Sequence, residues 1–245
     1  MVSHRRAAVS EFIGTFAIVF VGSGSLMMSA KSGSQASLLA AGIAYAMTLA
    51  GIIAALASVS AHFNPAITTA FMITRRTKPL DGAVKIAAQL LGAIVGAYLL
   101  KETFPADLAQ ATRLGGTQFS LDVTLMSGIV LEAVTTALLA ITVCGLGAIE
   151  ARPPIAGVVV GFIVGALILC VGPLTGASFN PARSLGPALA SGVWEGHLAY
   201  WIGPILGATV GTLLWDFGLA ARPESPVTPA PIEEHIVNQG KRKRA

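Results

Sequence analysis

The triplet Asn64-Pro65-Ala66 recurs as Asn180-Pro181-Ala182 in the second half of the chain. An apolar piece follows each triplet, over residues 66–73 and 182–190. Both pieces are too short to cross a bilayer, which takes about 20 residues. Asparagine is a good helix N-cap, and proline suits the first helical turn because the N–H that it lacks has no partner there. Each triplet therefore predicts the start of a short helix.

The composition around these triplets is that of a membrane protein. Of 245 residues, 54% are hydrophobic and only 11% are charged, whereas soluble domains carry about 25% charged residues. Much of the surface is therefore expected to face lipid. Apolar stretches of spanning length lie at roughly 7–28, 36–58, 82–100, 122–147, 155–173 and 198–220. These patterns predict an all-α membrane protein with six transmembrane helices and two re-entrant half-helices.

The two halves match beyond the triplets. Glu11 and Thr15 in the first stretch correspond to Glu132 and Thr136 in the fourth. Each half holds three spans, and an odd number of spans inverts the second copy relative to the first. We predict an inverted repeat in a channel domain over 1–220, with copies at about 7–103 and about 122–220. The Pro-rich, polar segment 221–245 is predicted to be a disordered cytoplasmic tail.

The positive charges predict the orientation. Arg5, Arg6, Arg76, Arg152 and the basic run 241–244 fall on one side of a six-span topology. The positive-inside rule places both termini in the cytoplasm. The compact loops indicate a multi-pass protein of a cell membrane, plasma or inner. A lipid bilayer is the expected surrounding, and the basic tail has no interleaved aromatics that would predict a nucleic-acid partner.

In an inverted repeat the two short helices enter from opposite faces and meet near the midplane. Their N-terminal dipole ends then face each other, each equivalent to roughly half a positive charge. The amides of Asn64 and Asn180 are expected to cap their own helices with oxygen and to point NH2 donors into the lumen. A water accepting from both is oriented so that it interrupts a proton-conducting chain. With Arg183 as a further barrier, the pattern predicts a passive channel that excludes protons and ions.

Ionisable residues inside the spans leave other functions to weigh. Glu11 and Glu132 could relay protons in a coupled transporter, or they could accept hydrogen bonds from the re-entrant loop of their own half. The duplication favours loop support. His62 is predicted as a pore-wall residue, with a pH gate or an acid–base pair with Glu11 as alternatives. Cys144 and Cys170 are predicted as small core residues. We expect no enzyme, metal site or cofactor.

The chain resembles the aquaporins and glycerol facilitators, the major intrinsic protein family. The matching motifs are Ser60-Ala61-His62-Phe63-Asn64-Pro65-Ala66-Ile67-Thr68 and Asn180-Pro181-Ala182-Arg183-Ser184-Leu185-Gly186-Pro187-Ala188. The resemblance implies an aquaporin-like fold and a homotetramer in which every subunit has its own pore. It also implies an outer constriction, or selectivity filter, built from Tyr45, Ile168, Ala177 and Arg183. Because the Ser60-Ala61-His62 segment is one residue shorter than usual, a helix-interface position for Tyr45 stays open.

The same resemblance gives mixed indications of the solute. Strict water channels usually have a histidine where Ile168 stands, and with the small Ala177 the filter is expected to be more apolar and wider. Other positions indicate a water channel, because glycerol-type relatives differ there: Ser184, Ala188 and the pair Tyr200-Trp201. We therefore predict water as the main solute, with ammonia, urea or small polyols also passing. A glycerol or solute facilitator with little water selectivity is the alternative.

Overall fold

The computed structural model describes residues 2–32 and 37–220, so the predicted tail at 221–245 lies outside it. Among the described residues, six helices are long and apolar enough to cross a membrane. The first joins α1 (His4–Ala17), the π-helical η1 (Ile18–Ser23) and α2 (Gly24–Ser32) without a break. The others are α3 (Ser37–Leu56), α5 (Pro79–Thr103), α7 (Leu125–Ala148), α8 (Pro153–Thr175), and α10 (Ala199–Leu214) extended by η3 (Trp215–Leu219). The predicted all-α class is confirmed.

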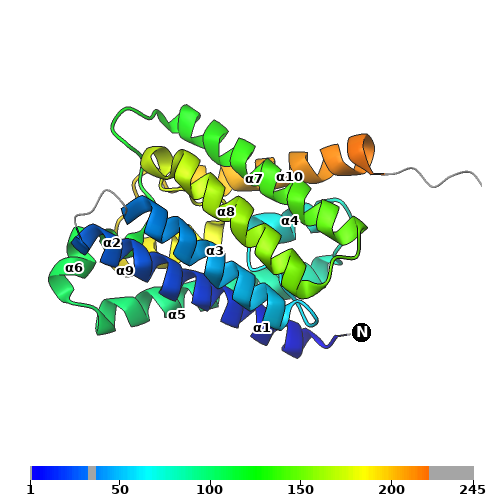
Figure 1. The fold of residues 1–245 in the computed structure, drawn as a ribbon, viewed down its shortest axis with the longest axis horizontal. Coiled ribbons are helices and arrows are strands. Elements are labelled where there is room, and N and C mark those ends of the chain that lie inside the picture. Colours follow the sequence, from blue (N-terminus) through cyan, green and yellow to red (C-terminus); the bar gives the residue numbers. More distant parts are fainter. Residues whose placement is uncertain (1, 33–36, 221–245) are drawn as a thin grey trace, which may run out of the picture.

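Two short helices complete the bundle, as predicted. α4 runs over Pro65–Ile73 and α9 over Pro181–Ser191, and each has proline in its first turn. Figure 1 shows α4 toward the end of the bundle that carries the N-terminus and α9 toward the opposite end. Two further short pieces, α6 (Ala106–Ala111) and η2 (Arg113–Gly115), lie in the connection between α5 and α7.

Glycines allow the same close packing in both halves. A Cβ on Gly92 of α5 would lie 2.3 Å from the carbonyl oxygen of Phe12 in α1. A Cβ on Gly207 of α10 would lie 2.0 Å from the carbonyl oxygen of Ala133 in α7. Only glycine lets these backbones approach so closely. Phe12 directly follows Glu11, and Ala133 directly follows Glu132. The pair α1 and α5 therefore packs in the same register as the pair α7 and α10.

One sequence expectation about the core is wrong. Cys144 on α7 is buried, but Cys170 on α8 is exposed on the outer surface of the bundle. α8 is apolar on nearly all sides, so its sequence pattern does not distinguish a core face from a lipid face.

Candidate pore

Two cavities enter the protein from opposite faces. One, of about 260 Å³, extends from the loop after α7, at Glu150 and Ala151, past both triplets to Arg183. The other, of about 690 Å³, opens at the loop before α7, around Gln118 and Phe119. The lining residues that they share are the four filter residues of the sequence analysis: Tyr45, Ile168, Ala177 and Arg183. These four therefore form the junction between the cavities.

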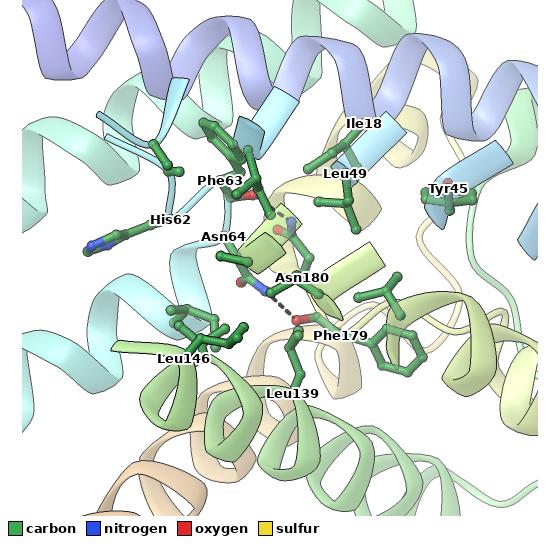
Figure 2. A pocket seen from close by; sticks show the side chains of 18 of the residues that line it. Ile18, Tyr45, Leu49, His62, Phe63, Asn64, Leu139, Leu146, Phe179 and Asn180 are labelled. Atoms are coloured by element: carbon green, nitrogen blue, oxygen red, sulfur yellow. Dashed lines mark hydrogen bonds between the residues drawn. The ribbon is translucent and has the colours of Figure 1, made fainter. Parts of the chain in front are cut away.

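The two asparagines cap their own helices and bind the opposite loop. Oδ1 of Asn64 accepts from the N–H of Ala66 at 2.8 Å, and Oδ1 of Asn180 accepts from the N–H of Ala182 at 3.0 Å. Nδ2 of Asn64 donates to the carbonyl oxygen of Phe179 at 2.7 Å, and Nδ2 of Asn180 donates to that of Phe63 at 2.8 Å. Figure 2 shows this reciprocal arrangement at the middle of the cavity.

These bonds change the expectation for the asparagine donors. Each amide NH2 has two hydrogens, and one of them is used by the opposite loop rather than by the lumen. One hydrogen remains on each of Asn64 and Asn180, and both residues line the cavity. The pair can therefore present two donors to a molecule in the pore while the loops stay joined.

The backbone before each triplet adopts a conformation that its residue type disfavours. Phe63 has φ of 49° and Phe179 has φ of 55°, both in the left-handed region. That region costs a non-glycine residue roughly 1–2 kcal/mol. The conformation turns each phenylalanine carbonyl toward the asparagine of the other loop, and its N–H toward a buried glutamate.

Glu11 and Glu132 accept those N–H groups. Oε2 of Glu11 accepts from the N–H of Phe63 at 2.6 Å, and Oε2 of Glu132 accepts from that of Phe179 at 2.8 Å. Neither glutamate has any exposed surface. The remaining donors are His62 N–H, Ser60 and Gln89 for Glu11, and Ser178 N–H and Thr175 for Glu132. Hydrogen bonds to charged acceptors, worth about 1.5–3 kcal/mol each, offset the backbone strain.

At the junction, a cation stacks on an aromatic ring. The guanidinium carbon of Arg183 lies 5.5 Å from the centroid of the Tyr45 ring. Gly22 makes room for that ring, since a Cβ there would lie 2.4 Å from it. Arg183 is 3% exposed, and its Nε and Nη1 have no hydrogen-bond partner among the described residues. Ile168 and Ala177 form an apolar wall of the same junction.

His62 lies on the other side of the asparagine pair from Tyr45 (Figure 2). Its Nδ1 is 3.1 Å from the hydroxyl of Thr68, and its Nε2 is 3.2 Å from the ammonium of Lys85. The ring packs edge-to-face on Phe71. His62 belongs to the loop between the second and third spans, where burial lowers its pKa to about 4 and keeps it neutral.

Several residues of this site were not found from the sequence. A phenylalanine stands before both triplets, and that repetition was an available signal for Phe63 and Phe179. Gln89 and Lys85 carry no such signal, because their partners come from other segments of the chain.

The sequence model of the major intrinsic protein family matches residues 1–215. The chain belongs to the major intrinsic protein family. Because the family consists of channels, this confirms the prediction of a channel protein rather than an enzyme.

Relatives of this major intrinsic protein include aquaporins of plants. Aquaporin TIP1-2 of Zea mays is 40% identical over 221 residues, which cover 86% of this chain and 85% of the relative. Probable aquaporin TIP3-2 of Oryza sativa subsp. japonica is 36% identical, with 90% and 84% covered. The aquaglyceroporin from Plasmodium falciparum has a similar fold, with a TM-score of 0.76 at 23% identity, covering 89% of this chain and 98% of that one.

Proposed function

We propose that this protein is a passive channel for water and small uncharged solutes that excludes protons and ions. One observation carries the proposal. The N-termini of two half-helices, joined by reciprocal bonds of Asn64 and Asn180, line one cavity that meets a second cavity at a four-residue junction. The relatives named aquaporin support it.

The asparagine pair supplies the expected proton exclusion. A water between the two remaining amide hydrogens accepts from both, so its own hydrogens point away from the pair along the pore. The neighbouring waters are then oriented in opposite directions, and the chain along which protons hop is interrupted. The dipole ends of α4 and α9 repel cations at the same point.

The junction governs which solutes pass. Arg183 repels cations, and its Nε and Nη1 are donors without a partner in the part of the chain that the structure describes. The side chains of Ile168 and Ala177 provide no polar contact and make part of the junction apolar. We infer that water is the main solute and that ammonia, urea or a small polyol also passes. A glycerol or solute facilitator with little water selectivity is the alternative, and the permeability ratios decide between them.

A proton-coupled transporter using Glu11 and Glu132 is not favoured. Both carboxylates already accept at least three hydrogen bonds from protein donors, and two of the donors are backbone N–H groups that cannot move with a proton. We infer that Glu11 and Glu132 support the loops.

We also propose a homotetramer in a cell membrane, plasma or inner, with both termini cytoplasmic and with inverted copies at about 7–103 and about 122–220. The matched packing of Gly92 and Gly207 supports the inverted copies. The basic residues Arg75, Arg76 and Arg152 lie in the loops on the side of the N-terminus, which supports the orientation.

Stopped-flow light scattering on proteoliposomes tests the function. The proposal expects osmotic water permeability well above that of empty vesicles, with flux linear in the gradient and independent of any ion gradient. Permeability equal to that of empty vesicles would defeat the water proposal. Glycerol permeability that exceeds water permeability would favour the facilitator.

A further inference from the structure

A lysine lies inside a spanning helix next to the pore wall. Lys85 of α5 is only partly exposed, and its ammonium lies 3.2 Å from Nε2 of His62, a residue that lines the cavity. Charges within spans are costly and mark functional positions by default. Neither the asparagine pair nor the junction at Arg183 makes use of the charge of Lys85.

The hydrogen bonds around His62 determine its tautomer. An ammonium only donates, so Nε2 of His62 must accept from Lys85. On the other side of the ring, the single hydroxyl hydrogen of Thr68 is donated to the carbonyl oxygen of Asn64 at 2.9 Å. The Thr68 oxygen therefore accepts from Nδ1 at 3.1 Å. Both contacts require the neutral ring with its hydrogen on Nδ1.

Within residues 2–32 and 37–220, no carboxylate forms an ion pair with Lys85. Asp81, one turn earlier on α5, binds Nε2 of His4 at 2.8 Å. Glu11 is the other nearby acid, and its carboxylate is already occupied by Ser60, Gln89 and the loop N–H groups.

The second half of the chain has no counterpart to this charge. Lys85 and Tyr200 both lie seven residues before the glycines Gly92 and Gly207, which pack identically in the two halves. Tyr200 donates its hydroxyl hydrogen to the carbonyl oxygen of Thr175 at 2.8 Å, a neutral contact. Helix packing at this position therefore does not require a charged side chain. The ammonium of Lys85 must have a role other than packing.

We propose that Lys85 is a specificity-determining residue of the pore, whose ammonium on Nε2 of His62 places a positive charge on the side of the asparagine pair opposite Arg183. The inference rests on the proposed channel function. A cation that enters from the face of the N-terminus meets this charge before it reaches Asn64 and Asn180. A proton cannot be passed on by His62, because the acceptor nitrogen of the ring is occupied by a cation.

Proton conductance of proteoliposomes tests the charge, in a background where the Arg183 barrier has been removed. We compare Arg183→Val, Arg183→Val with Lys85→Met, and Arg183→Val with Lys78→Met. Lys78→Met is the matched control, since it removes an exposed lysine on the same face that has no contact with His62. We expect the Lys85 double variant to conduct protons about threefold faster than Arg183→Val. The Lys78 double variant should equal Arg183→Val.

Equal proton conductance in all three proteins would overturn the inference. An equal rise in both double variants would also overturn it, because net charge alone would then be the cause. Adding Lys85→Arg to Arg183→Val keeps the charge and should hold the conductance at the Arg183→Val level. Osmotic water permeability of the wild type is measured in parallel. A value equal to that of empty vesicles would count against the channel function itself, separately from the role of Lys85.

A spectroscopic measurement covers the case in which Arg183→Val does not fold. Nitrogen-15 NMR of labelled histidine should show His62 protonated at Nδ1 and bare at Nε2 in wild type at neutral pH. In Lys85→Met, Nε2 loses its donor while Nδ1 still donates to Thr68, so the Nε2 resonance should move toward that of a nitrogen without a hydrogen bond. An unchanged Nε2 resonance in Lys85→Met would show that Lys85 does not donate to His62, and would overturn the inference.

Discussion

Glu132 holds the second re-entrant loop through three donors, and removing its carboxylate should release that loop. The donors are the Thr175 hydroxyl at 2.7 Å and the N–H groups of Ser178 and Phe179 at 3.0 and 2.8 Å. Glu132→Ala leaves both N–H groups buried without an acceptor, and it leaves the Thr175 hydroxyl with only the carbonyl oxygen of Val171 at 3.5 Å. Each unpaired buried donor costs about 1–3 kcal/mol, so the sum is on the order of 5 kcal/mol. That loss is comparable with the whole stability of many domains, about 5–15 kcal/mol.

Glu132→Gln separates the hydrogen bonds from the volume of the side chain. An amide oxygen in the place of Oε1 keeps Thr175 and the N–H of Ser178, but the amide NH2 then faces the N–H of Phe179. One donor is lost instead of three, so the expected cost is about 2 kcal/mol. The left-handed conformation of Phe179 loses its support, and we expect water permeability to fall along with stability.

The assay is equilibrium unfolding in mixed micelles as the fraction of SDS is raised. Glu102→Gln is the matched control, because Glu102 is exposed at the end of α5 and should change stability by less than about 0.5 kcal/mol. We expect the order wild type and Glu102→Gln, then Glu132→Gln, then Glu132→Ala. If Glu132→Ala unfolded at the same fraction of SDS as Glu102→Gln, the role of Glu132 in supporting the loop would be refuted.

Three further changes test the filter and the pore wall. Ile168→His narrows the junction and adds a polar group, so urea and glycerol permeability should fall on the order of tenfold relative to water; an unchanged ratio would place Ile168 outside the filter. Ala177→Cys should make water flux sensitive to mercury, whereas wild type should resist, because neither Cys144 nor the exposed Cys170 lines the two cavities. Wild-type inhibition by mercury would contradict this. Water permeability should be flat from about pH 5 to pH 8, because burial lowers the pKa of His62 to about 4. In the unfolded chain His62 has its ordinary pKa of about 6.5 and is protonated at a higher pH than in the folded protein, so the free energy of unfolding should fall as pH drops from about 6.5 toward 4. A step in water permeability near pH 6.5 would show that His62 titrates in the folded channel and would contradict this prediction.

Much of the fold was predictable because its causes are local. A bilayer sets the length and apolar character of each span, and both Asn-Pro pairs of this chain start a helix. The first span is longer than predicted because its polar start, from His4, continues the same helix toward the membrane surface.

The parts that were not predictable depend on contacts between distant segments. The bond from Asn64 to the carbonyl oxygen of Phe179 joins the two halves, and it requires a left-handed phenylalanine that residue preferences argue against. Lys85 looks like an ordinary residue in the first turns of a helix until His62 is placed beside it. The alternation of apolar residues could not show that Cys170 faces outward, because α8 is apolar on nearly every side.

The most direct measurement is of water and proton permeability on the same proteoliposomes. Osmotic permeability is followed by light scattering, and proton flux by an internal pH dye under a potassium diffusion potential. A channel built on the Asn64 and Asn180 pair should raise water permeability well above that of empty vesicles and leave proton flux at the level of the lipid alone. Proton flux that rises together with water flux would contradict the interruption of the water chain at this pair.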